Sequence, residues 1–117
     1  MSITSIIIDD EWGNIENLSF MLAKYCPEVI VLDSATSAAE GIAKIQTLKP
    51  QLVFLDIEMP HASGFDMLEK LMPVDFEIIF VTAYNQYAIR AIRFCALDYL
   101  LKPIDITELQ AAIKRVG

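Results

Sequence analysis

The sequence predicts an α/β domain in which a parallel sheet of five strands is covered by helices on both faces. Short runs of consecutive apolar residues, typical of strands buried on both faces, alternate five times with stretches of helical periodicity. No repeat, linker or break interrupts the alternation, and short right-handed crossovers then leave few other topologies. A length of 117 residues supports one domain, residues 1–117, with a real hydrophobic core.

The first half of the chain contributes three strands and two helices. Apolar runs predict the strands at residues 3–8, 29–32 and 52–55. Apolar residues spaced by three and four predict a helix between the first two strands, and Pro27 ends it. Ser37 and Glu40 have the spacing of a capping box, in which each side chain bonds the backbone of the other, so they open the second helix. Lys49 and Pro50 stop that helix before the third strand.

The second half repeats the alternation. A short helix fits residues 63–72, and strands are expected at 78–82 and 97–101. Asn85 can cap a fourth helix that runs to about Cys95, with Ala88, Ile92 and Cys95 at helical spacing. Asp105 caps a last amphipathic helix that continues to about Val116.

Bulk composition excludes several classes of function. Hydrophobic residues make up 55% of the chain and charged ones 21%, as in a folded globular domain. A net charge of −7 argues against direct binding of nucleic acid or of an anionic membrane. Two distant cysteines, Cys26 and Cys95, suggest packing roles in a reducing compartment. Without an apolar run of 18 residues or a secretory signal, a cytoplasmic protein is expected.

Polar side chains stand at the ends of four expected strands. Asp9 and Asp10 follow the first strand, and Asp56 follows the third. Thr82 ends the fourth strand, and Lys102 follows the fifth. In parallel sheets ligands bind outside the carboxyl ends of the strands, where the winding reverses. Any one of these residues alone is ordinary loop or turn chemistry, but together they predict a single site.

The composition of this site points to metal-assisted phosphoryl chemistry. Two carboxylates 4 Å apart repel by about 4 kcal/mol at an effective dielectric constant near 20, so three of them need a cation or a proton. Hard oxygen ligands without His or Cys suit Mg²⁺ better than Zn²⁺. A carboxylate such as Asp56, beside Mg²⁺ and Lys102, is placed to attack a phosphoryl group, with Thr82 donating a hydrogen bond.

At these residues the chain resembles a response-regulator receiver domain of two-component signalling. The resemblance covers essentially the whole chain. Its motifs are Ile8-Asp9-Asp10-Glu11, Phe54-Leu55-Asp56-Ile57-Glu58-Met59-Pro60 with Gly64, Val81-Thr82-Ala83, and Tyr99-Leu100-Leu101-Lys102-Pro103. The resemblance implies a flavodoxin-like, doubly wound α/β fold with five parallel strands in the order 2-1-3-4-5 and five helices.

The resemblance also implies a role for each acidic residue. Asp56 would accept a phosphoryl group from a phosphohistidine on a sensor histidine kinase. Asp10 and Asp56 would bind Mg²⁺ directly, the backbone carbonyl of Glu58 would be the third protein ligand, and Asp9 would act through water. We expect a switch that phosphorylates itself from a phosphodonor and loses the phosphoryl group slowly, and not an enzyme that turns over a substrate.

Three further residues receive roles from the same resemblance. Thr82 and Lys102 would contact the phosphoryl group. Tyr99 matches a switch aromatic that turns inward when the Thr hydroxyl moves toward the phosphate. The Lys102–Pro103 peptide bond is expected to be cis. We also hypothesise that Tyr84 shields the phosphoryl group and so slows its loss.

The stretches 82–89 and 96–104 resemble receivers that are joined to a LytTR-type DNA-binding domain. The chain is then a piece of a longer transcription regulator, which we favour, or a stand-alone receiver. In the family, activated receivers pair through the fourth helix, fifth strand and fifth helix, so a homodimer through this surface is a further expectation.

Three other functions compete with this interpretation. Residues 54–58 faintly resemble the aspartate-nucleophile motif of haloacid-dehalogenase-type phosphatases, but the second Asp and the following Gly-Thr are missing. A pure interaction module with the same fold is the second alternative, and the complete set of acids, Thr82 and Lys102 argues against it. A flavin site is the weakest, because Asp9, Asp10 and Glu11 would repel a phosphate.

Overall fold

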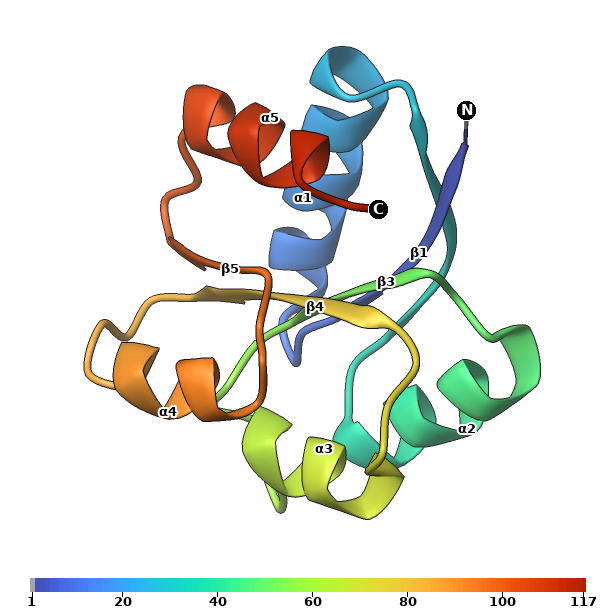
Figure 1. Ribbon diagram of the computed structural model, residues 1–117, viewed down its shortest axis with the longest axis vertical. Coiled ribbons are helices and arrows are strands. Elements are labelled where there is room, and N and C mark those ends of the chain that lie inside the picture. The colour runs from blue at the N-terminus through green and yellow to red at the C-terminus, as the bar shows by residue number, and fades with distance from the viewer. Residues whose placement is uncertain (1) are drawn as a thin grey trace.

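The computed structural model describes residues 2–117, and strands and helices alternate five times along them (Figure 1). Their bounds are β1 Ile3–Ile8, α1 Trp12–Tyr25, β2 Val29–Ala35, α2 Ala38–Leu48, β3 Leu52–Leu55, α3 Gly64–Leu71, β4 Glu77–Thr82, α4 Ala88–Arg93, β5 Asp98–Leu101 and α5 Ile106–Lys114. Each element that the sequence predicts is present. The second strand is longer than predicted, since it continues to Ala35.

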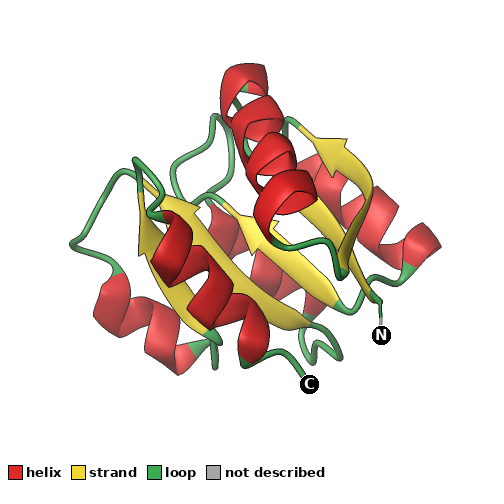
Figure 2. Cartoon of the chain, turned by 90° about the horizontal axis from the view of Figure 1, so that it is seen from above, coloured by secondary structure: helices red, strands yellow, loops and turns green. Residues whose placement is uncertain are grey.

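The five strands form one parallel sheet in the order β2-β1-β3-β4-β5, as the family resemblance implied. The chain steps from β1 outward to β2, returns to β3 on the other side of β1, and continues in that direction. The winding therefore reverses between β1 and β3. Because the strands are parallel, all their carboxyl ends meet at one edge of the sheet (Figure 2).

Helices cover both faces of the sheet. Helices α1 and α5 lie on one face, and α2, α3 and α4 lie on the other (Figure 1). Successive side chains of a strand point to opposite faces of the sheet, so each face has its own hydrophobic core. Ile7 packs with the α1–α5 layer, whereas its neighbours Ile6 and Ile8 pack with the α2–α4 layer. The sheet is thus buried on both sides, which explains why its strands read as unbroken apolar runs.

Two of the predicted helix starts are capped as expected. The Ser37 hydroxyl accepts a hydrogen bond from the Glu40 N–H at 3.2 Å, and Asp105 caps α5 by accepting from the Glu108 N–H. The other half of the predicted capping box is wrong. The Glu40 carboxylate accepts from the Thr36 N–H at 2.8 Å, because it reaches past Ser37 to the residue before it.

The prediction for the fourth helix is wrong at both ends. Asn85 does not cap it: α4 begins after Tyr87, whose side chain makes no cap hydrogen bond. Cys95 lies beyond its end in a left-handed conformation, with φ of 58°. The helical spacing of Ala88, Ile92 and Cys95 does not mark the buried side of the helix, since Ile92 is 72% exposed and the buried residue of α4 is Ala91. The aromatic ring of Tyr87 packs against the core just before the helix, so one small helical residue suffices to cover the sheet there.

Both cysteines are free, with Cys26 buried and Cys95 exposed, so neither forms a disulfide. Gly117 lies at the edge of the sheet opposite the carboxyl ends of the strands. Its N–H donates a hydrogen bond to the side chain of Glu77, the first residue of β4. Over residues 2–117, no helix combines the length and the apolar character needed to cross a bilayer.

Candidate functional site

The carboxyl edge of the sheet gathers the charged residues that the sequence singles out. Asp9 and Asp10 directly follow β1, and Asp56 directly follows β3, which is the neighbour of β1 in the sheet. One oxygen from each of these carboxylates lies within 4.8 Å of the others. Lys102 follows β5 and extends its ammonium group into the same cluster. Strand order explains why the acids converge, because β1 and β3 are neighbours in the sheet, and the long side chain of Lys102 reaches them past the end of β4.

Lys102 bridges two of the three carboxylates. Its Nζ donates to Asp9 Oδ2 at 2.6 Å and to Asp56 Oδ2 at 3.1 Å. The side chains of Asp9 and Asp56 are only 6% and 8% exposed, and that of Lys102 is 18% exposed. Ion pairs with so little solvent around them are weakly screened, so removing one partner leaves an uncompensated buried charge.

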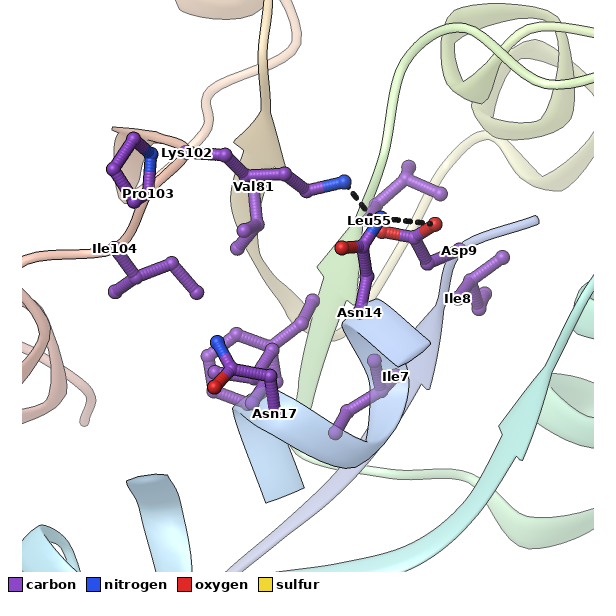
Figure 3. A pocket seen from close by; sticks show the side chains of 12 residues that line it. Ile7, Ile8, Asp9, Asn14, Asn17, Leu55, Val81, Lys102, Pro103 and Ile104 are labelled. Carbon is purple, nitrogen blue, oxygen red and sulfur yellow. Dashed lines mark hydrogen bonds and ion pairs between the residues drawn. The ribbon is translucent and has the colours of Figure 1, made fainter. Parts of the chain in front are cut away.

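Asp9 is held from both sides (Figure 3). While Lys102 donates to Oδ2, the other oxygen accepts from the Glu11 N–H at 2.9 Å and from the Asn14 amide at 3.4 Å. Glu11 immediately precedes α1, and Asn14 lies in its first turn. The first helix therefore fixes the orientation of a carboxylate that the first strand delivers.

Asp56 is fixed by its own backbone. Its N–H donates to the Ile8 carbonyl at 2.9 Å, which extends the pairing of β1 and β3 by one step. Its Oδ1 accepts from the Ile57 N–H at 2.7 Å, which leaves Oδ2 facing Lys102. Gly64 packs against it: a Cβ added there would lie 2.4 Å from the Asp56 carbonyl oxygen. The backbone of Asp56 therefore packs so closely against position 64 that only glycine fits there.

Burial and neighbouring charge shift two pKa values in the cluster. Burial raises the pKa of Asp56, the positive charge of Lys102 opposes that shift, and the negative charge of Asp9 adds to it. For Lys102, burial lowers the pKa, but the hydrogen bond to Asp9 and the charges of Asp56 and Asp9 outweigh burial and raise it. The ammonium group therefore stays protonated, and Asp56 takes up a proton more readily than an exposed aspartate does.

Thr82 and Tyr99 lie on the two strands beyond Asp56. Thr82 ends β4, is fully buried, and its hydroxyl accepts from the Tyr84 N–H at 3.4 Å. Tyr99 is half-buried in β5, where its ring packs against Phe80, and its hydroxyl donates to the backbone carbonyl of Tyr84. The segment that follows β4 thus contacts both residues. The Lys102–Pro103 peptide bond is cis, as expected.

A cavity of about 360 Å³ opens beside the cluster, between α1 and the segment that follows β5 (Figure 3). Its polar lining comes from Asp9, Asn14, Asn17 and Lys102, and its floor is apolar strand residues such as Phe54. Neither Asp10 nor Asp56 lines it. Of the three carboxylates only Asp9 lines the cavity, so the acidic cluster borders the cavity through Asp9 and Lys102.

Comparison with known proteins assigns the family. The model of the response regulator receiver domain matches residues 6–114. The chain belongs to the response regulator receiver family. This receiver domain is 44% identical over 115 residues to a response regulatory protein of Vibrio cholerae, which covers 97% of the chain and 48% of that protein. It is 39% identical over 112 residues to the transcriptional regulatory protein BtsR of Escherichia coli K12, covering 95% of the chain and 46% of BtsR.

Solved structures agree. The receiver domain of AraT, a response regulator from Geobacillus stearothermophilus, superposes with a TM-score of 0.86 at 25% identity, covering 99% of this chain and 93% of that one. The chain spans about half the length of the curated relatives it matches. The matched family model and the shared fold identify it as a response regulator receiver domain.

The donor set of the receiver site fits a hard divalent cation. The cluster contains three carboxylates and one ammonium group, so it carries an excess of negative charge. The oxygen atoms are close enough for one ion to touch more than one of them. Oxygen ligands, with waters completing the shell, are what Mg²⁺ requires.

Sequence reasoning missed one polar contact beside the site. The Tyr87 hydroxyl donates to Glu58 Oε2 at 2.8 Å, which ties the segment after β4 to the segment after β3. The two residues are 29 positions apart, and no spacing rule joins them. A tyrosine one residue before a helix carries no signal of a distant partner, so only the folded chain reveals the pair.

Proposed function

We propose that this receiver domain is a Mg²⁺-dependent phosphorylation switch in which Asp56 accepts a phosphoryl group from a phosphohistidine on a sensor histidine kinase. One observation carries the proposal. Asp56 holds its Oδ2 3.1 Å from the Lys102 ammonium, inside a cluster of three carboxylates at the carboxyl edge of the sheet. A nucleophilic carboxylate, a fixed cation and a metal-binding acid pair are the parts that phosphoryl transfer needs.

In the proposed step an Asp56 carboxylate oxygen attacks phosphorus. The new O–P bond forms as the P–N bond of the phosphohistidine breaks, and the imidazole nitrogen leaves with the electron pair. Lys102 neutralises charge on the phosphoryl oxygens, and the Thr82 hydroxyl donates a hydrogen bond to one of them. The product is an acyl phosphate on Asp56. Because Asp56 must be ionised to attack, its raised pKa favours a site in which a bound cation stabilises the carboxylate.

In this proposal Asp10, Asp56 and the backbone carbonyl of Glu58 hold Mg²⁺, with Asp9 acting through water. The bound ion offsets the repulsion among the carboxylates and supplies positive charge to the phosphoryl oxygens. The Lys102 ammonium orients the Asp9 carboxylate toward the cluster through the contact of 2.6 Å. Asp9 and Asp56 are therefore preorganised before any ion or phosphoryl group arrives.

The output is proposed to be a change of surface and not turnover of a substrate. Thr82 and Tyr99 both contact the segment that begins at Ala83, so movement of the Thr82 hydroxyl toward a phosphoryl group changes what Tyr84 can bond. Tyr99 then turns inward and alters the face formed by α4, β5 and α5. We propose that this face pairs two receivers. Transcription through a LytTR-type domain is the proposed final output, in keeping with the name of BtsR.

Mass spectrometry after incubation with acetyl phosphate tests the chemistry. Wild-type protein should gain the mass of one phosphoryl group in the presence of Mg²⁺, and EDTA should prevent the gain. Asp56→Asn should remain unlabelled, and peptide mapping should place the group on Asp56. Labelling of the Asn variant to the wild-type extent would refute the assignment. Continuous release of phosphate from a small phosphomonoester would instead support the phosphatase alternative.

A further inference from the structure

We propose that Tyr87 is a positioning residue for magnesium: through the Glu58 carboxylate, its hydroxyl sets the orientation of the backbone carbonyl of Glu58 that ligates the ion. The inference rests on the proposed function, because it concerns the same metal site. It adds a residue from the segment before α4, outside the set of acids, Thr82 and Lys102. The observation behind it is the hydrogen bond of 2.8 Å from Tyr87 Oη to Glu58 Oε2.

The backbone around Glu58 is anchored on both sides and free in between. The side chains of Ile57 and Met59 are 1% and 8% exposed, so the core holds both neighbours. The Glu58 side chain is exposed, and its described polar contact is the hydroxyl of Tyr87. With two buried anchors, the freedom that remains is rotation of the peptide planes about the line that joins them. That rotation turns the Glu58 carbonyl, and a fixed Glu58 side chain opposes it.

The core holds the hydrogen-bond donor in place. The ring of Tyr87 packs edge-on against Phe65 at a centroid distance of 6.1 Å and against Tyr84 at 6.3 Å. Phe65 is fully buried. Since the ring is fixed by these contacts, the hydroxyl is presented to Glu58 at little further entropic cost. Removing the hydroxyl alone therefore leaves the packing intact, and this separates positioning from stability.

Electrostatics agree with the direction of the bond. The hydrogen bond to Glu58 raises the pKa of Tyr87, in agreement with the Tyr87 hydroxyl as donor and the Glu58 carboxylate as acceptor. A hydrogen bond to a charged acceptor is shorter and stronger than a neutral one. Without it, the Glu58 carboxylate is free to rotate, and the segment between Asp56 and Pro60 loses a polar link to the segment before α4.

Metal dependence of self-labelling tests the inference. The rate of phosphoryl transfer from acetyl phosphate to Asp56 is measured across Mg²⁺ concentrations for wild type and for Tyr87→Phe. We expect the Mg²⁺ concentration at half-maximal rate to rise about tenfold, at the lower end of the effect of removing a partner that orients a metal ligand. The rate at saturating Mg²⁺ should stay near the wild-type value, since Tyr87 touches neither the ion nor the phosphoryl group.

Three further variants sharpen the result. Tyr25→Phe, at the far end of α1, is the matched control and should leave the Mg²⁺ dependence unchanged. Glu58→Ala should reproduce the effect of Tyr87→Phe. The double variant should be no worse than either single one, because both remove the same interaction. Unfolding temperatures without metal are measured in parallel, and Tyr87→Phe should lower them no more than Tyr25→Phe does.

The outcomes separate two failures. A wild-type protein that is not labelled at any Mg²⁺ concentration refutes the proposed function, and the role of Tyr87 fails with it. A labelled wild type with an unchanged Mg²⁺ dependence in Tyr87→Phe overturns the positioning role alone. Effects of Tyr87→Phe and Glu58→Ala that add in the double variant also overturn it. A loss of stability with no change in Mg²⁺ dependence assigns Tyr87 to packing.

Discussion

Replacing Lys102 by methionine is the most informative single perturbation of this receiver domain. Methionine replaces the apolar stem of the lysine with one of similar shape and removes the charge that bridges Asp9 and Asp56 at 2.6 and 3.1 Å. Both carboxylates are nearly buried, so water cannot replace the ammonium group. In the absence of metal the cluster is left with three acids and no cation.

The size of the effect follows from these contacts. A unit charge 4 Å from an opposite one gains about 4 kcal/mol at an effective dielectric constant near 20, and both contacts are shorter. Removing one partner of a buried pair costs about 3–5 kcal/mol, and the partial exposure of Lys102 favours the lower value. We therefore expect about 3 kcal/mol, which for a chain of 117 residues lowers the unfolding temperature by about 12 °C.

Thermal unfolding without Mg²⁺, followed from pH 4 to pH 8, measures this loss. Lys44→Met is the matched control: Lys44 also pairs with two carboxylates, Asp33 at 3.2 Å and Glu40 at 3.8 Å, but on the exposed surface. Exposed pairs contribute about 1 kcal/mol or less, so the control should lose little. Saturating Mg²⁺ should restore much of the stability that Lys102→Met loses, because the ion supplies the missing positive charge.

The sign of the pH dependence is fixed by the carboxylates that lose their cation. Without Lys102 the folded-state pKa of Asp56, already raised, rises further. A carboxylate with a raised folded-state pKa contributes stability that is present below its unfolded pKa and is lost as pH rises through the folded one. The deficit of Lys102→Met should therefore be largest near pH 8 and shrink toward pH 4. A loss no greater than that of Lys44→Met would refute the reasoning, as would a deficit independent of pH.

Three further predictions follow from the site. Asp56→Asn should raise the unfolding temperature at pH 7 without Mg²⁺, because burial raises the pKa of Asp56 and its negative charge therefore opposes folding at that pH. The difference from wild type should vanish near pH 4. An Asn variant that is less stable than wild type at pH 7 would contradict this prediction. Gly64→Ala should cost about 2 kcal/mol by denaturant unfolding, since the added Cβ meets the Asp56 carbonyl at 2.4 Å. Gly13→Ala, in the first turn of α1 with nothing within 4 Å of the added Cβ, should instead gain about 0.4–1 kcal/mol, and equal effects of the two substitutions would argue against the clash. Thr82→Ala should slow labelling of Asp56 by acetyl phosphate about tenfold or more through loss of a donor to the phosphoryl oxygens, whereas an unchanged rate would remove Thr82 from the site.

Much of the fold can be predicted from the sequence, because burial on both faces leaves a plain pattern. The run Ile6-Ile7-Ile8 is continuous since alternate residues meet different helix layers. The fourth helix is the exception. Ile89 and Ile92 have helical spacing and are 73% and 72% exposed, so periodicity there marks a surface and not the core. Hydrophobic spacing alone does not tell which side of a short helix faces the sheet.

The site can be predicted in composition but not in its contacts. Strand ends place Asp9, Asp56 and Lys102 at one edge, and the sheet order makes the two acids neighbours. Lys102 pairs with Asp9 and Asp56 because its side chain is long enough to reach them from the end of β5. The spacing of residues in the sequence does not predict these contacts. The bond from Tyr87 to Glu58 depends likewise on where two unrelated segments cross.

The parallel sheet has a practical consequence for the two ends of this chain. Ile3 begins β1 and Gly117 bonds Glu77 at the first residue of β4, so both ends lie on the rim farthest from Asp56. A tag or tether attached at either end leaves the acidic rim unobstructed. In the proposed switch, a domain tethered at this end would sense the state of Asp56 through repacked helices, across the full length of the strands.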